Sequence, residues 1–258
     1  MVDVIGAYVI RVLGGKSTML GGGMLSKEIE ILKQWGYTSD AAKRIVKTKD
    51  FNKPVYRFLK EESFADDFCN GAVYISTLSK CRQHENQEQG DQLEGTMFSF
   101  GVGEEVSQGG NLSSKRSHLG TYSFIDCDGY TDGGNYEMLK HKNAFVLCTT
   151  KSYRPDIFNE SFGPHCVRID NPLVFTWELS EAIKREYKIN VMKASEVKYG
   201  SRDVSGKSVS LLDMCFIKPS APYSIQEEFR FFWDVIGEIE PRVFYSDKIP
   251  RIVRKITK

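Results

Sequence analysis

The apolar residues of this chain change their spacing at Pro54, and this change limits the folds open to it. Between residues 26 and 48 they recur at helical spacing, which is typical of amphipathic helices. After Pro54 they come in short runs rich in valine, isoleucine, tyrosine and phenylalanine, and glycine, proline, asparagine and aspartate stand between the runs. Such runs predict short strands joined by turns.

The order of these elements predicts the fold class. Helices come early and short strands later, so we expect an α+β fold with a mixed or antiparallel sheet. Helices are expected at residues 26–48, 63–69 and 176–185. Strands are expected at 55–59, 73–78, 144–150, 166–169, 187–192, 214–218 and 228–235. We divide the chain into a glycine-rich N-terminus with a helical appendage, residues 1–50, and a main domain, residues 51–258, which carries a long loop insertion at 79–137.

Composition excludes several classes of protein. Of the 258 residues, 41% are hydrophobic, which is enough to build a core and argues against a disordered chain. No run of about 20 apolar residues is present, so no membrane span is expected. The six cysteines are scattered without a C-x-x-C pair, which indicates reduced thiols, no metal site of that kind and a cytoplasmic location.

Charge is distributed unevenly along the chain. Residues 1–60 carry a net charge of +6, residues 61–137 a net charge of −10, and residues 138–258 a net charge of +5. A total of +1 argues against binding of nucleic acid through bulk positive charge. The segments either neutralise one another as solvated faces, or place an acidic centre beside basic walls that hold phosphates.

Three short patterns carry candidate chemistry. Arg57 lies in the middle of the strand expected at 55–59, where a guanidinium is favourable if it faces a phosphate or carboxylate. Ser76 and Thr77 lie at the end of the next expected strand, where hydroxyls can hold a catalytic carboxylate or simply reflect strand propensity.

The third pattern is Gln226-Glu227-Glu228-Phe229-Arg230. A strand that includes Gln226 would place it with Glu228 and Arg230 on one face, because alternate residues of a strand share a face. A shift of register by one residue would bring Glu227 to that face in place of Glu228. The alternative is a surface ion pair between Glu228 and Arg230, which contributes little.

Taken in order, Arg57, then Ser76-Thr77, then Gln226-x-Glu228 resemble the R, S-T-S and [QE]-x-E pattern of the ADP-ribosyltransferase superfamily. Leu78 stands where the third residue of S-T-S would be, which is a departure from the pattern. The resemblance implies a sheet core of ADP-ribosyltransferase type and an enzyme that cleaves NAD and transfers ADP-ribose. NAD would be a co-substrate, and no metal would be required.

The resemblance also implies a role for each residue. Glu228 would stabilise the oxocarbenium-like transition state near the ribose, Ser76 would position Glu228, and Gln226 would orient the acceptor. Arg57 and Thr77 would hold the dinucleotide. The rings of Tyr74 and Tyr223 are candidates for stacking on nicotinamide.

The acceptor is expected to be RNA, DNA or, nearly as well supported, a protein. An enzyme of this class acting inside its own cell suits a bacterial toxin of a toxin–antitoxin or anti-phage system, with an antitoxin protein as a partner. Two basic strips are candidate phosphate contacts. They comprise Lys43, Arg44 and Lys47 in the appendage and Arg251, Arg254 and Lys255 near the C-terminus.

Two other functions remain open. The carboxylates between Glu85 and Glu94 form a polar loop that could bind a divalent metal and cut phosphodiesters, although it lacks the D-x-D-x-D-G spacing of a calcium loop. The chain could also be a non-catalytic binding protein, in which the Gln226–Arg230 segment is only structural.

Overall fold

The computed structural model describes residues 8–11, 29–30, 33, 39, 53–84, 90–100, 104–107, 113–117, 120–123, 127–132, 136–205 and 211–257. The chain divides into two compact units, and each is built from segments that are distant in the sequence. Unit 1 comprises Met1–Thr77, Phe145–Glu196 and Glu227–Lys258, and unit 2 comprises Leu78–Ala144 and Val197–Gln226.

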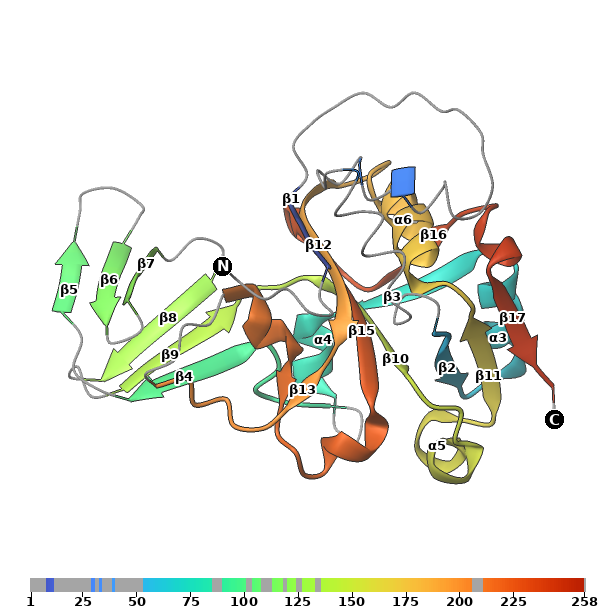
Figure 1. Ribbon diagram of the computed structural model, residues 1–258, viewed down its shortest axis with the longest axis horizontal. Helices are drawn as coiled ribbons and strands as arrows, with labels where there is room; N and C mark the ends of the chain where they lie inside the picture. The colour runs from blue at the N-terminus through green and yellow to red at the C-terminus, as the bar shows by residue number, and fades with distance from the viewer. Residues whose placement is uncertain are drawn as a thin grey trace. The chain divides into compact units, whose positions relative to one another are not determined.

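Unit 1 is built on a nine-stranded sheet whose neighbouring strands are antiparallel (Figure 1). Along the sheet the order is β1, β12, β15, β10, β2, β11 and β17, while β3 pairs with both β10 and β16. The strands span β1 Tyr8–Arg11, β2 Val55–Leu59, β3 Ala72–Thr77, β10 Phe145–Thr150, β11 His165–Ile169, β12 Lys188–Glu196, β15 Glu228–Ile236, β16 Arg242–Tyr245 and β17 Val253–Ile256.

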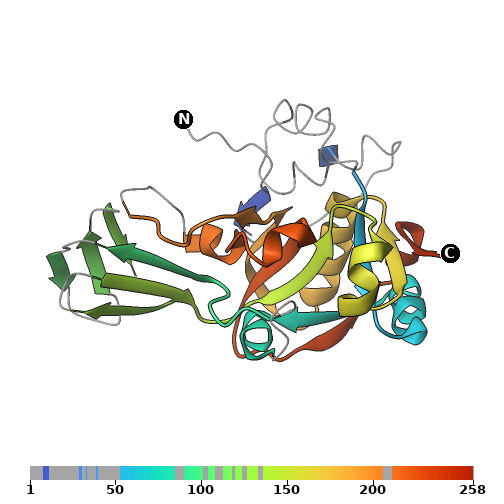
Figure 2. The same ribbon diagram turned by 90° about the horizontal axis from the view of Figure 1, so that it is seen from below.

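Helices cover the two faces of this sheet. On one face, α3 (Glu62–Cys69) and α6 (Pro172–Ile183) meet through the stacked rings of Phe68 and Phe175, 5.8 Å apart. Phe175 in turn packs against Phe231 of β15, at 5.1 Å, and this face carries the main hydrophobic core. On the other face, α5 (Pro155–Phe162) packs Phe158 against Phe58 of β2, so that α5 and α6 lie on opposite sides of the strands (Figure 2).

The sequence explains why α6 forms although ten of its twelve residues are buried. Asn171 caps its N-terminus, since the side-chain oxygen accepts a hydrogen bond from the Val174 N–H at 3.1 Å, and Pro172 occupies the first helical turn. Its Ser180 hydroxyl accepts a hydrogen bond of 2.7 Å from Trp233 Nε1 of β15. This bond satisfies the one polar group of a fully buried indole.

Unit 2 contains small sheets and short helices. One three-stranded antiparallel sheet has the order β4, β9, β8, a second has the order β5, β6, β7, and the short strands β13 and β14 pair in parallel. The strands span β4 Thr96–Phe100, β5 Glu104–Ser107, β6 Ser113–Ser117, β7 Gly120–Ser123, β8 Cys127–Asp132, β9 Tyr136–His141, β13 Lys198–Tyr199 and β14 Ile217–Lys218. The helix is α4 Leu78–Gln83, and the 3₁₀ helices are η2 Leu211–Phe216 and η3 Tyr223–Gln226; a further one, η4 Ile249–Arg251, lies in unit 1.

The expected α and β content with a mostly antiparallel sheet is confirmed, and so are most of the expected strands. The strand expected at 214–218 is wrong for its larger part, because η2 runs to Phe216 and only two residues are extended. The helix expected at 176–185 begins four residues earlier. Most of the helical appendage expected within 1–50 lies outside the described residues. None of the helices in the described part of the chain has the length and apolarity needed to cross a membrane.

Candidate functional site

The sheet of unit 1 contains a fork, and the strands on its two sides carry Arg57 and Ser76. Strands β2 and β3 both pair with the same edge of β10, but at opposite ends of it. Tyr56 of β2 lies opposite Thr150, whereas Ser76 of β3 lies opposite Val146. The two strands therefore separate beside the middle of β10, near Cys148. The other edge of β10 is paired along its whole length with β15.

Arg57 lies at this fork. Its Nη1 donates a hydrogen bond of 2.5 Å to the backbone oxygen of Cys148, the β10 residue between the part paired with β2 and the part paired with β3. The guanidinium thus reaches from β2 to the backbone of β10 at the fork. A guanidinium carries five N–H donors, so this bond leaves donors for a ligand.

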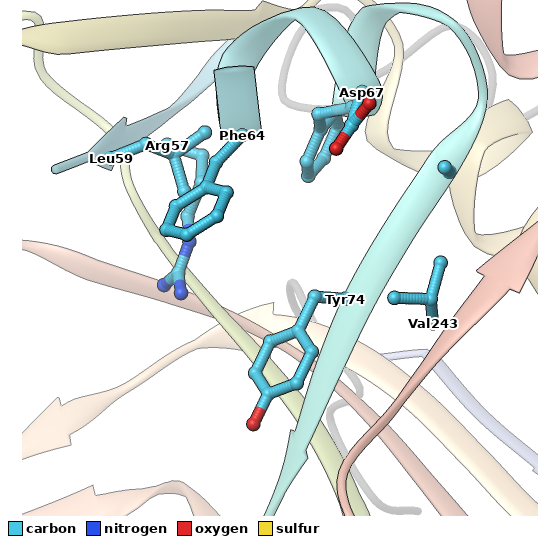
Figure 3. Close-up of a pocket in the computed structure, with 8 residues that line it drawn as sticks. Arg57, Leu59, Phe64, Asp67, Tyr74 and Val243 are labelled. Carbon is cyan, nitrogen blue, oxygen red and sulfur yellow. The ribbon is translucent and has the colours of Figure 1, made fainter. Parts of the chain in front are cut away.

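The same guanidinium lines a pocket of about 320 Å³ (Figure 3). The pocket lies within unit 1, among β2, α3, β3 and β16, and its volume is in the range of small-molecule sites. Its lining is mostly apolar, with one cationic and one anionic side chain. The lining residues are Arg57, Leu59, Phe64, Asp67, Phe68, Ala72, Tyr74 and Val243.

A corner of two adjacent carboxylates begins β15, on the far edge of β10 from the fork. Glu228 lies directly opposite Thr150, the last residue of β10. Glu227 precedes the strand with a φ of 43°, in the left-handed region that non-glycine residues seldom adopt and that is enriched at functional sites. Its carboxylate accepts a hydrogen bond from the Ser152 hydroxyl, and its backbone oxygen accepts one of 3.0 Å from the Lys151 N–H. The corner is therefore held from both its side chain and its backbone.

The two carboxylates differ in environment. The Glu228 side chain is 4% exposed, and its Oε1 accepts a hydrogen bond of 2.8 Å from Nε of Arg230, which is 1% exposed. Glu227 is half-buried. Glu228 is thus part of a buried ion pair, whereas Glu227 is more exposed and bonds to the Ser152 hydroxyl.

The structure changes the expected relation between Gln226 and Glu228. The strand was expected to include Gln226, with both side chains on one face. Instead β15 begins at Glu228, Glu227 interrupts the extended backbone, and Gln226 is the last residue of η3 in unit 2. Alternation along a strand therefore does not relate the two side chains.

Ser76 is not brought to Glu228. The register separates them by two strand spacings and four residues along β10, which is roughly 16 Å between Cα atoms in a flat sheet. A serine side chain does not cover this distance. Thr77 is buried opposite Phe145, whereas Tyr74 is 51% exposed at the pocket.

A hydroxyl group does bond to the carboxylate corner, but it comes from the residues after β10: the Ser152 hydroxyl donates to the Glu227 carboxylate. Thr150 lies opposite Glu228 in the strand register, and its hydroxyl donates a bond of 3.4 Å to the Ser152 backbone oxygen. The Thr149 hydroxyl also donates a bond of 2.7 Å to the Phe229 backbone oxygen. These residues were not predicted from the sequence, although the string Thr149-Thr150-Lys151-Ser152 at the end of a buried strand is a signal of the same kind as Ser76-Thr77.

Tyr223 lies in the interior of unit 2 and not at the pocket. It is 8% exposed, its hydroxyl donates a bond of 2.8 Å to the Gly90 backbone oxygen, and Lys218 Nζ stands 5.0 Å from its ring centre. Burial, and next the charge of Asp91, raise the pKa of its hydroxyl. With its ring enclosed in this way, Tyr223 offers no open face for stacking on a ligand.

The acidic loop is only partly described, because residues 85–89 lie outside the described residues. The two acids that follow are buried: Asp91 pairs with Arg202, and Glu94 with Lys218 at 3.6 Å. In the described part of the chain no three histidine, cysteine or acidic side chains are grouped so as to hold a metal ion.

The expected basic strips are described in part. Lys43, Arg44 and Lys47 lie outside the described residues. Near the C-terminus, Arg254 is paired with Asp170 at 2.5 Å, and Lys255 with Glu62 and Asp66 at 2.6 and 2.7 Å. Arg251 is exposed in η4. Acids of unit 1 therefore neutralise much of this strip.

Comparison with known proteins yields no relative. No protein-family model matches the chain, and neither the search of curated proteins nor the search of solved structures returns a match.

Proposed function

We propose that this protein is an NAD-dependent ADP-ribosyltransferase whose site lies in unit 1, at the fork of the sheet and the adjoining carboxylate corner. The observation that carries the proposal is the role of β10, which has Arg57 and the pocket on one edge and the Glu227–Glu228 corner on the other. A sheet core of ADP-ribosyltransferase type belongs to the same proposal.

The chemistry follows from these groups. The glycosidic bond between the ribose C1′ of NAD and the nicotinamide nitrogen breaks, and nicotinamide leaves with the bonding electrons. The acceptor nucleophile forms a bond to C1′ and loses a proton. A carboxylate beside the ribose stabilises the positive charge that develops in the transition state. Arg57 binds the pyrophosphate, for which a guanidinium is well suited.

Two carboxylates compete for the central role. The resemblance of Gln226-x-Glu228 to the family pattern assigns it to Glu228. The greater exposure of Glu227 and its hydrogen bond from Ser152 favour Glu227 as the group that meets substrate. Ser152, which donates to the Glu227 carboxylate, takes the positioning role first assigned to Ser76.

The acceptor is RNA, DNA or a protein. An enzyme of this class acting on its own cell would serve as a toxin or anti-phage effector restrained by an antitoxin protein. The paired state of Arg254 and Lys255 weakens the case for the C-terminal strip as a nucleic-acid contact, while Arg251 stays a candidate.

The test is transfer of label from adenylate-labelled NAD to total RNA, DNA and protein, with nicotinamide release measured in the same samples. Wild type is compared with Glu227→Gln and Glu228→Gln, and Glu181→Gln on the exposed side of α6 is the matched control. We expect label in one fraction with wild type and the control, and its loss in one of the two corner variants. No label and no nicotinamide from folded protein would refute the proposal and favour a binding protein.

The metal-dependent nuclease is not favoured by any observation among the described residues. Asp91 and Glu94 are both engaged in buried ion pairs. Cleavage of RNA or DNA by the wild type that requires Mg²⁺ or Mn²⁺ and persists in Glu228→Gln would restore that alternative.

A further inference from the structure

Two of the aromatic residues that line the pocket at the fork, Phe64 and Tyr74, have exposed rings. Phe64 of α3 is 53% exposed and Tyr74 of β3 is 51% exposed. Both line the pocket, and Figure 3 shows the Phe64 ring extending from α3 and the Tyr74 ring from β3. Rings that come from two separate elements and line one pocket suit a flat heteroaromatic ligand, since such ligands stack on aromatic faces.

The two charged side chains of the pocket further limit the kinds of ligand that it can bind. Arg57 offers guanidinium donors from β2, and Asp67 offers a carboxylate from α3 (Figure 3). A ligand that satisfies both groups carries an anionic group and, at another point, an N–H donor. A nucleoside monophosphate whose base has an exocyclic amine has this combination, with the phosphate for Arg57 and the amine for Asp67.

The position of the carboxylate corner indicates which half of NAD lies in the pocket, and this inference rests on the proposed function. The corner lies across β10 from Arg57, whereas α3 and Tyr74 lie on the fork side of β10. If the pyrophosphate sits at Arg57, the ribose whose bond breaks extends toward the corner. The other half of NAD, adenosine phosphate, is left for the pocket.

We propose that the pocket formed by β2, α3, β3 and β16 is an adenylate site in which Phe64 and Tyr74 border the adenine ring and Asp67 accepts a hydrogen bond from its exocyclic amine. Arg57 binds the adjoining phosphate. Phe64 and Asp67 are thereby specificity-determining residues, which no pattern in the sequence had marked.

The test is calorimetric titration of the full chain with AMP, IMP, ADP-ribose and nicotinamide mononucleotide. Phe64→Ala is expected to weaken AMP binding at least fivefold, which is the lower end of the effect of losing one base–aromatic stack. IMP lacks the exocyclic amine, so wild type is expected to prefer AMP to IMP, and Asp67→Ala, which removes the acceptor, is expected to abolish this preference. Tyr245→Ala is the matched control, because Tyr245 is 57% exposed on β16 and does not line the pocket.

Several results would overturn the inference: no AMP binding to wild type, AMP binding that is equal in Phe64→Ala and wild type, or Phe64-dependent binding of nicotinamide mononucleotide in preference to AMP. The assay needs no turnover, so it is separate from the test of the proposed function. Phe64-dependent AMP binding without NAD cleavage would support the adenylate site and refute the transferase. NAD cleavage by a protein whose AMP binding does not depend on Phe64 would support the transferase and refute the adenylate site.

Discussion

Replacing Glu228 by alanine tests whether this residue has a structural role as the partner of Arg230. The two side chains are 4% and 1% exposed, and Nε and Oε1 are 2.8 Å apart. Removal of one partner from a buried ion pair leaves the other charge without compensation, which typically costs about 3–5 kcal/mol. A domain is stabilised by only about 5–15 kcal/mol, so Glu228→Ala should lower the free energy of unfolding by a large part of the total.

Glu228→Gln is the milder change. The amide oxygen still accepts a hydrogen bond from Arg230, and only the charge is lost, so we expect a cost of about 1–3 kcal/mol. The double variant Glu228→Leu with Arg230→Met replaces both charges by apolar groups of similar size. It should be closer to wild type than either single variant, because neither charge is then left buried alone.

The assay is urea unfolding followed by tryptophan fluorescence, for which the buried Trp233 on the same strand is a suitable reporter. A cost below about 1 kcal/mol for Glu228→Ala would refute the reasoning, since no buried ion pair is broken so cheaply. Loss of NAD cleavage in Glu228→Gln would then indicate a catalytic role. If Glu228→Ala lowers the free energy of unfolding by about 3–5 kcal/mol, the activities of the variants have to be compared at equal fractions of folded protein.

Three further predictions follow from buried groups. Asp91→Ala should leave Arg202 buried without its carboxylate and increase hydrogen exchange in residues 90–100 but not in β15; unchanged exchange would contradict a stabilising pair in unit 2. Burial raises the pKa of the Cys166 thiol to about 12, whereas in the unfolded chain its pKa is about 9.0. The unfolded thiol therefore ionises first, and the free energy of unfolding, measured by urea titrations, should fall between pH 9 and 12. Cys166→Ala should reduce this fall, and an equal slope in both proteins would exclude Cys166 as its cause. Trp233→Phe removes the 2.7 Å bond to Ser180 and should cost about 1–2 kcal/mol in the same assay, whereas Trp177→Phe on the half-buried part of α6 should cost less.

Local patterns were sufficient to predict the strands that form the site. β2, β10 and β15 are runs of β-branched and aromatic residues, and each occurs within a residue or two of the expected bounds. Their preference is local, so it can be read from neighbouring residues alone.

The start of α6 was harder to predict because ten of its twelve residues are buried. A helix buried over most of its surface has only a narrow polar face, so the periodicity that marks an amphipathic helix is weak. The signal that was present, Asn171 followed by Pro172, is a capping signal and not a periodic one. The strand prediction at 214–218 failed for a related reason, since a short apolar run does not distinguish a strand from a helical turn.

For the site, the sequence predicted Arg57 and the glutamates but not the hydroxyl groups beside them. Whether Ser76 or Thr150 lies opposite Glu228 depends on which strands pair with which, and pairing joins residues far apart in the chain. Thr150 and Glu228, for example, are brought together only by the register of β10 with β15. No local pattern contains that information.

The hydrogen bond between Arg57 and the Cys148 carbonyl has a consequence for the energetics of binding. An arginine side chain free in solution samples many rotamers, and ordering it on a ligand costs entropy. Here the hydrogen bond of 2.5 Å to the Cys148 carbonyl orders the guanidinium in the folded protein before any ligand arrives. The entropic cost of ordering this side chain is therefore met on folding, and under the proposed function the remaining N–H donors would bind a phosphate with little further loss of freedom.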